Sequence, residues 1–394
     1  MSARSTLVVA LIFNSLLLLY FAQSLSITYH GARIIYEEHS AIGYILRALL
    51  DLFGSSDIVV RAPLILMNSL SALLLYAISA DYISSERERV WLVVIFLLLP
   101  GVISSSLLVD GAAFVTLALF FYVYLRKKVA HYADLMLPFM LIAQSAFLLL
   151  FASLSLYAFI KKEYRYMVLY LLLFCLSLYL HGFNTGGLPM NQFLDTLGLY
   201  GALFSPVIFL YIIYVLYHRI VLKQIDLLLI ISSSAFVLSL LLSFRQRVEV
   251  EMFAPYLLLS LPLIMQTYCS SYRVRLPQFR KRYKSLFVVA MLFLLVHVAV
   301  ALSNKIPYRF LDNPSSYFAY RTHVANELSS KLKQMGIECI DADDKKMQLR
   351  LKFYGIKQCD RYKLHKDGTQ DAKSVTISYF KTEVAKFYVS DLHK

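Results

Sequence analysis

The chain has 394 residues, of which 59% are hydrophobic and only 16% are charged, and its formal net charge is +14. A soluble domain typically carries about a quarter charged residues, so this composition excludes an ordinary water-soluble protein. Nucleic-acid binding is not expected, because the basic residues lie in loops and in the C-terminal tail without the aromatic and glycine pattern of an RNA-binding module.

Apolar segments of near membrane-spanning length dominate the first 303 residues. With flanking residues each can form a helix close to the hydrocarbon thickness, and in lipid only a helix satisfies its own backbone hydrogen bonds. The predicted spans are 13–25, 62–78, 91–109, 112–124, 167–179, 199–217, 227–242, 253–265 and 286–302. The first segment lacks a small-residue cleavage site and is followed by further spans, so we interpret it as a retained signal-anchor.

Dense basic clusters occupy every second break between these segments. They lie at 87–89, 126–128, 161–165, 218–223 and 273–284. The other loops are 26–60, the turn near Asp110, 182–198, 244–251 and everything after about 304. Short loops rich in Lys and Arg are typical of the cytoplasmic side. The sequence therefore predicts an inner (plasma) membrane protein with a cytoplasmic N-terminus and an extracytoplasmic C-terminus.

The apolar stretch 135–160 has a basic cluster of the cytoplasmic type on each side. A single tilted helix would put one cluster on the wrong side, so we predict a tight hairpin of two short helices bent near Gln144 and Ser145. Counting the hairpin as two gives about eleven spans. The predicted fold is an all-α polytopic membrane domain over 1–303.

Residues 304–394 are charged and indicate a small extracytoplasmic α/β domain. The pattern predicts a helix over 324–335 and strands over 337–340, 349–354, 374–379 and 386–389. Cys339 and Cys359 flank one predicted strand on the oxidising side of the membrane. Such a pair more often forms a disulfide than binds metal, and no CxxC or His-bearing spacing favours zinc. We therefore predict a Cys339–Cys359 disulfide.

The loop 26–60 is not simply polar. Its apolar residues recur at helical spacing while Glu37 and Glu38 occupy other faces, which predicts amphipathic helices along the membrane surface. Arg61 follows at the start of the second span, and Asp110 lies at the outer end of the third. A carboxylate at a membrane edge is costly unless it is paired or functional, so Asp110 is a candidate site residue.

This layout resembles the GT-C membrane glycosyltransferases, in particular family 39, which includes protein O-mannosyltransferases and the aminoarabinose transferases of lipid A. The resembling residues are Leu52-Phe53-Gly54-Ser55, Arg61, Pro100 through Asp110-Gly111-Ala112, Leu203-Phe204-Ser205-Pro206, Arg245, Arg247 and Phe253-Ala254-Pro255. The resemblance implies transfer of a sugar from a polyprenyl-phosphate donor to a lipid, glycan or protein acceptor on the outer face. It covers nearly the whole chain in layout, but each motif is short.

Such a transfer needs a carboxylate or His to take the acceptor proton and cations to stabilise the departing phosphate. Guanidinium groups suit phosphate, so Arg61, Arg245 and Arg247 are predicted substrate-binding residues, together with Tyr29. The alternative for Arg61 is a snorkelling anchor. The alternative for the other two arginines is a solvated loop, self-paired with nearby glutamates.

One departure from the family bears on activity. The family's acidic pair just after the first span is absent, because residues 26–32 contain no carboxylate. Either Glu37, Glu38 or His39 has taken over the role of base, or the chain has lost activity and serves as a scaffold. A transporter of lipid-linked substrates is a third reading. No cofactor is expected, the expected partners are the lipid-linked donor and membrane lipids, and a metal requirement, the sugar and the acceptor stay open.

Overall fold

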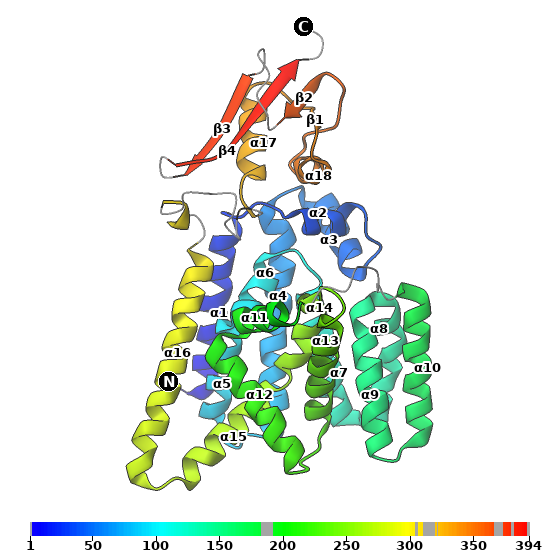
Figure 1. The fold of residues 1–394 in the computed structure, drawn as a ribbon, viewed down its shortest axis with the longest axis vertical. Helices are drawn as coiled ribbons and strands as arrows, with labels where there is room; N and C mark the ends of the chain where they lie inside the picture. The colour runs from blue at the N-terminus through cyan, green and yellow to red at the C-terminus, as the bar shows by residue number, and fades with distance from the viewer. Residues whose placement is uncertain are drawn as a thin grey trace. The chain divides into compact units, whose positions relative to one another are not determined.

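A computed structural model of the chain describes residues 2–182, 192–303, 306–309, 320, 322–365, 373–379 and 382–391. Most of these residues are helical (Figure 1). The helices of the N-terminal three quarters are α1 (Ala3–Ala22), α2 (Tyr29–Tyr36), α3 (Ala41–Phe53), α4 (Asp57–Ile78), α5 (Glu86–Leu98), α6 (Pro100–Leu107), α7 (Ala112–Val129), α8 (Leu137–Ala143), α9 (Leu148–Ile160), α10 (Tyr164–His181), α11 (Phe193–Phe204), α12 (Pro206–Val221), α13 (Leu227–Ser243), α14 (Val250–Leu258), α15 (Leu261–Val274) and α16 (Pro277–Leu302).

The chain folds into two compact units. Unit 1 comprises Met1–Ser15, Leu66–Ser105 and Gly111–Val298, and unit 2 comprises Leu16–Ile65, Ser106–Asp110 and Ala299–Lys394. The predicted boundary at 303 lies close to the border at 298. Unit 2 also takes in the predicted extracytoplasmic loop and the turn that ends at Asp110, which are distant in sequence from the C-terminal part.

Fewer candidate membrane spans than the predicted eleven are found among the described residues. Four helical segments among the described residues, Ala3–Ala22, Asp57–Asp81, Tyr164–His181 and Pro277–Leu302, are long and apolar enough to cross a membrane. Three bent helix pairs raise the number to seven if each pair is one span. The fold is thus that of a helical membrane protein with four to seven candidate spans, and the predicted eleven is not confirmed.

Proline explains why three predicted spans are broken. The α5–α6 pair bends by 56°, the α11–α12 pair by 107° and the α14–α15 pair by 42°. Pro100, Pro206 and Pro262 stand at or next to the start of the second helix of each pair. Proline lacks an N–H and disfavours helical backbone in the residue before it, so a helix ends there and a new one begins. The predictions of continuous helices over 91–109, 199–217 and 253–265 are therefore wrong in this respect.

The predicted hairpin over 135–160 is confirmed in its bend. Gln144 has extended backbone between α8 and α9, and its side chain lies against Gly111 at the start of α7. The other end of the stretch returns to the end of α7, because His131 stacks on Tyr166 with ring centroids 3.5 Å apart and lies 3.7 Å from Glu163. The chain therefore runs out to Gln144 and back.

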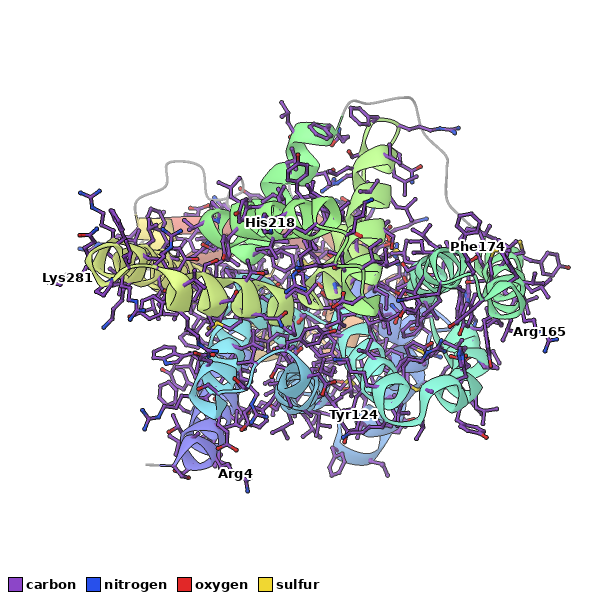
Figure 2. The ribbon with its side chains drawn as sticks, turned by 90° about the horizontal axis from the view of Figure 1, so that it is seen from below. Arg4, Tyr124, Arg165, Phe174, His218 and Lys281 are labelled. Atoms are coloured by element: carbon purple, nitrogen blue, oxygen red, sulfur yellow. A yellow bond between two sulfur atoms is a disulfide. The ribbon has the colours of Figure 1, made fainter. Side chains whose placement is uncertain are left out.

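The basic clusters gather at one end of unit 1. Ion pairs join helix ends there: Arg4 to Glu86 at 3.8 Å, Lys127 to Asp81 at 3.1 Å and Arg273 to Glu88 at 2.7 Å. Figure 2 views the molecule from this end and labels Arg4, Arg165, His218 and Lys281. Helices whose basic ends lie together agree with the alternation of loops on which the predicted topology rests.

The C-terminal part of unit 2 is the predicted α/β domain. It contains α17 (Ala325–Gln334), α18 (Lys345–Phe353) and a four-stranded mixed sheet in the order β1-β2-β4-β3. The strands are β1 (Asp341–Ala342), β2 (Tyr362–His365), β3 (Lys373–Tyr379) and β4 (Thr382–Asp391). The sulfurs of Cys339 and Cys359 are bonded, with their Cα atoms 5.5 Å apart, so the disulfide is confirmed.

Two strand predictions in this domain need correction. Residues 349–354 lie mostly in α18, whose buried side chains Met347, Arg350 and Leu351 recur at helical spacing. Over 337–340 only an isolated parallel bridge between Cys339 and Lys357 forms, and the named strand begins at Asp341. The helix at 324–335 and the two C-terminal strands agree with the prediction, while β2 was missed.

Candidate functional site

Two polar assemblies contain residues that the sequence predicts for the site. One is a buried ion-pair network within unit 2, which contains Arg61. The other is a polar cavity within unit 1, which contains Arg247.

The ion-pair network starts at the first turn of α4. Asp57 and Arg61 lie four residues apart, are 8% and 1% exposed, and their Oδ1 and Nη1 atoms are 2.8 Å apart. The guanidinium also donates to the carbonyl oxygens of Leu107 at 2.7 Å, and of Ala22 and Ser26 at 3.2 Å. Buried cations need such full pairing. The guanidinium that the resemblance assigns to a phosphate is engaged by protein groups in this structure.

Side chains of the C-terminal domain complete the network within unit 2. The Tyr354 hydroxyl donates to both carboxylate oxygens of Asp57 at 3.0 Å and accepts from the Ile27 N–H at 2.9 Å. Asn326 donates to Asp57 at 3.2 Å, and the Arg350 Nε donates to the Ile27 carbonyl at 2.8 Å. Burial raises the pKa of the Tyr354 phenol, which keeps it a neutral donor, and lowers the pKa of the Arg350 guanidinium.

The other predicted residues of unit 2 lie around α2. Asp110 is only 5% exposed. A Cβ at Gly31 would lie 2.8 Å from the Cβ of Val109, so α2 packs closely on the turn that carries Asp110. Glu37 and Glu38 are at the far end of α2, about 9 Å further along the helix axis.

These helix-end groups have local partners. Glu38 pairs with Arg33 at 2.7 Å, and the His39 Nδ1 lies 3.1 Å from the Tyr44 hydroxyl. Glu37 and His39 are exposed, and Tyr29 is half-buried. The structure brings α2 and the Asp110 turn together, while the roles predicted for the glutamates, His39 and Tyr29 stay predictions.

The polar cavity of unit 1 has a volume of about 300 Å³. It lies where α9 and α14 begin and α10 and α13 end. Its polar lining side chains are Ser145, Ser177, His181, Gln246, Arg247 and Glu249, and its apolar side chains include Leu148, Leu149, Leu242, Met252 and Phe253. These are the helix ends opposite to those that carry the basic clusters, because α9 ends at Ile160 and α10 begins at Tyr164.

The cavity contains hydrogen-bonding groups that find no partner in the part of the chain that the structure describes. Ser177 is 1% exposed, and its Oγ and the buried Oε1 of Gln246 have no partner among the described residues. Native proteins rarely leave such atoms unpaired, so each calls for an explanation. The His181 Nε2 donates to the Leu141 carbonyl at 2.7 Å, which leaves Nδ1 as an acceptor. The cavity thus offers a cation, a carboxylate, an imidazole and two acceptor oxygens.

The structure separates the two predicted arginines of the loop after α13. Both are exposed, but Arg247 lines the cavity and Arg245 does not. Glu249, treated in the sequence as a partner of these arginines, also lines it. This loop therefore contributes one of its two arginines and one carboxylate to a single polar pocket.

Ser177, His181 and Gln246 were missed by reasoning from the sequence. The one available signal was polar residues at the last turns of the apolar segment 167–179 and its flank, which by itself indicates only a helix end. Of the predicted acceptor loop 182–198, residues 183–191 lie outside the described residues, and Gly182 lines the cavity.

The residues that the structure describes include no group of three or more His, Cys, Asp or Glu side chains able to hold a metal ion. A scan against protein-family models finds no match for this chain, and no curated protein matches it.

Proposed function

We propose that this chain is a membrane glycosyltransferase that moves a sugar from a polyprenyl-phosphate donor to an acceptor, and that the polar cavity of unit 1 binds the polar part of its substrates. The cavity supports this proposal through its chemistry. A guanidinium suits a phosphate, hydroxyl and amide oxygens suit sugar hydroxyl groups, and a carboxylate can take the acceptor proton.

The observation that carries the proposal is that charged side chains and buried oxygens without hydrogen-bond partners among the described residues line one cavity at the helix ends. Arg247 and Glu249 line the cavity beside buried oxygens of Ser177 and Gln246 that have no partner among the described residues. About 300 Å³ is at the small end of ligand pockets, and it fits a single sugar with its phosphate better than a large cofactor. If the basic end of unit 1 faces the cytoplasm, the cavity opens towards the outer face, where lipid-linked sugars serve as donors.

Within this proposal Arg247 holds the donor phosphate and Glu249 is the first candidate for the base. Asp110, the candidate that the resemblance singles out, belongs to unit 2 and is not part of this cavity. The His181 Nδ1 is available to orient a hydroxyl group. Arg61 is left out, because its donors already serve Asp57 and backbone carbonyl groups.

The test is sugar transfer from a panel of radiolabelled polyprenyl-phosphate sugars to membrane extracts, with the wild type and single variants in proteoliposomes. Arg247→Ala should weaken donor binding by about 2 to 3 kcal/mol, which is about 30- to 150-fold in KM. Glu249→Gln should lower kcat by about 10²-fold, because it removes the base. Arg245→Ala, two residues away and outside the cavity, should leave both constants near wild type.

Near-wild-type transfer by both Arg247→Ala and Glu249→Gln would show that the cavity is not the site. No transfer by the wild type from any donor would favour the inactive-scaffold alternative. One observation already supports that alternative: Arg61, which the resemblance assigns to substrate, is bound in a structural network.

A further inference from the structure

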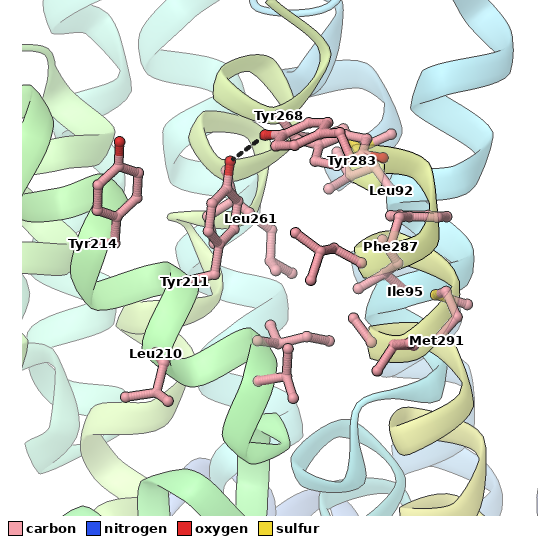
Figure 3. A pocket seen from close by; sticks show the side chains of 17 residues that line it. Leu92, Ile95, Leu210, Tyr211, Tyr214, Leu261, Tyr268, Tyr283, Phe287 and Met291 are labelled. Carbon is pink, nitrogen blue, oxygen red and sulfur yellow. Dashed lines mark hydrogen bonds between the residues drawn. The ribbon is translucent and has the colours of Figure 1, made fainter. Parts of the chain in front are cut away.

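A second cavity in unit 1 differs from the polar one in its size and in the polarity of its lining. Its volume is about 540 Å³, and nearly all of its lining is apolar (Figure 3). Side chains from α5, α12, α15 and α16 form it, among them Ile95, Leu210, Leu261, Phe287 and Met291. It is partly open, so it is better described as a groove between helices.

Helix α16 forms one wall of this groove and faces away from the protein over most of its surface. Only 11% of its most apolar stretch is buried in the protein. Side chains such as Leu286, Val289 and Leu292 are exposed. An apolar helix of this length with so little protein cover is at home in the hydrocarbon of a bilayer. The groove therefore opens to lipid chains rather than to water.

Tyrosine side chains mark one end of the groove. Tyr268 and Tyr283 stack with ring centroids 4.8 Å apart, and the hydroxyl groups of Tyr211 and Tyr283 are 3.5 Å apart (Figure 3). The Arg275 guanidinium lies 4.3 Å from the centre of the Tyr283 ring. Tyrosine prefers the boundary between hydrocarbon and headgroups, so this end of the groove is at the membrane surface.

The same end is strongly cationic. The end of α15, the turn after it and the start of α16 contain six basic residues, Arg273, Arg275, Arg280, Lys281, Arg282 and Lys284. The sequence 252–311 contains no acidic residue. Arg273 pairs with Glu88 and Arg280 donates to two backbone carbonyl groups. Among the described residues no carboxylate pairs with Arg275, Lys281, Arg282 or Lys284. An apolar groove thus leads directly to four cations without acidic partners.

We propose that this groove is a binding site for one anionic glycerophospholipid of the leaflet at the basic end. An acyl chain occupies the groove, the phosphate lies at the Arg275 side of Tyr283, and the other cations hold the headgroup. Along α16 the lining runs from Tyr283 to Met291, about 12 Å, which accommodates most of one chain. The charge complementarity selects an anionic headgroup over a zwitterionic one. This site is independent of the proposed transfer reaction.

The chain carries its own probe for this site. Trp91 is its single tryptophan, and its ring lies 6.0 Å from that of Phe287, which lines the groove. Lipids brominated on the acyl chain quench tryptophan fluorescence on contact. We would reconstitute the full chain in phosphatidylcholine vesicles and replace part of the lipid by brominated phosphatidylglycerol or brominated phosphatidylcholine. Phosphatidylglycerol should show a relative association constant about fivefold higher or more at low salt.

Two variants test the two halves of the site separately. Arg275→Gln with Lys284→Gln should abolish the preference for phosphatidylglycerol. Ala290→Phe fills the apolar part of the groove without changing the charge. It should reduce the preference for phosphatidylglycerol to the level expected for lipids that contact the protein without a specific site. Lys161→Gln with Lys162→Gln is the matched control, because it removes two cations from another turn of the same basic end and should leave the preference unchanged.

Equal quenching by the two brominated lipids would overturn the proposal. So would a preference that survives both groove variants, or one that the control pair removes as effectively. Recovery of fluorescence with excess unbrominated polyprenyl phosphate, but not with unbrominated phosphatidylglycerol, would assign the groove to a polyprenyl chain instead. Gel filtration of each variant confirms that it is folded before quenching is compared.

Discussion

Single buried residues contribute much of the stability of unit 2, and substitutions at Asp57 test this most directly. Replacing Asp57 by Ala leaves the Arg61 guanidinium buried with backbone carbonyl groups but no counter-ion, and breaking a buried pair in this way costs about 3 to 5 kcal/mol. Tyr354→Phe removes one buried donor and should cost about 1 to 3 kcal/mol. Thermal unfolding in detergent, detected by limited proteolysis of the C-terminal domain, measures the loss of stability in both variants.

Asp51→Ala is the control for these variants, because Asp51 is exposed on α3. Equal melting temperatures for Asp57→Ala and Asp51→Ala would mean that the network contributes nothing to stability. Loss of sugar transfer in Tyr354→Phe without loss of stability would instead return Arg61 to the functional site.

Gly31 is the second residue-scale case. An added Cβ would lie 2.8 Å from the Cβ of Val109 and 3.2 Å from its carbonyl oxygen, so α2 and the turn before Asp110 would have to separate. Gly31→Ala should therefore lower stability by about 1 to 3 kcal/mol. Gly198→Ala in α11 meets no atom within 4 Å and should be neutral or stabilising. A melting temperature for Gly31→Ala at or above that of Gly198→Ala contradicts the close packing.

At this scale the sequence identified unusual residues better than it identified their partners. Arg61 and Asp110 were singled out because charges at a membrane edge need a reason, and both prove to be buried. The pairing of Asp57 with Arg61, four residues apart on one helix, could have been read from the sequence. That Tyr354 and Arg350 belong to the same network could not be predicted, because their contacts join residues about 300 positions apart. Hydrophobic periodicity carries no information on such pairs.

Between two of the helices, the backbone at Ser205 is strained. Ser205 has a φ of 65° at the 107° bend from α11 to α12. Residues other than glycine adopt this backbone region at a cost of about 1 to 3 kcal/mol. Ser205→Gly should therefore raise the melting temperature. The Ser205 hydroxyl is buried and has no partner within the described ranges. Ser205→Ala removes this hydroxyl but keeps the Cβ, so it separates the effect of the strain from that of the hydroxyl. No gain from glycine beyond that from alanine would contradict the strain.

The disulfide ties the loop that includes α18 to the sheet of the C-terminal domain. Its loop spans 20 residues, so replacing Cys339 and Cys359 together by serine should destabilise the domain by about 3 kcal/mol on the chain-entropy estimate. Cys175→Ser, at an exposed free cysteine, is the control. The same melting temperature with and without reductant would show that the bond adds no stability.

The helices and strands were predicted correctly where the local sequence pattern determines them, and the predictions failed where other contacts do. The predicted bend near Gln144 is correct because basic clusters flank the stretch on both sides, so its two ends were expected on the same side of the membrane. The breaks before Pro100 and Pro206 could have been read from the proline itself, since the apolar pattern continues across both. Residues 349–354 alternate as a strand would, but α18 buries Met347, Arg350 and Leu351 on one helical face.

For the whole molecule, the topology is the prediction with the widest consequence. Alkaline phosphatase fused to the C-terminus should be active and green fluorescent protein at the same point dark, because the basic end of unit 1 is expected in the cytoplasm. Fusions within the turn at 161–163 between α9 and α10 should give the opposite pair of results. A fluorescent, phosphatase-negative C-terminus would put the polar cavity on the cytoplasmic side and remove the outer-face donor from the proposed reaction.

The hairpin of α8 and α9 has a consequence for how the protein is made. Helix α8 has seven residues and is about 10 Å long, while the hydrocarbon core is about 30 Å thick. Such a segment cannot be recognised and released into lipid alone as it leaves the ribosome. It can take its position only when α10, whose His181 bonds the Leu141 carbonyl of α8, has been synthesised. The order in which these helices settle in the membrane is then not the order in which they are translated.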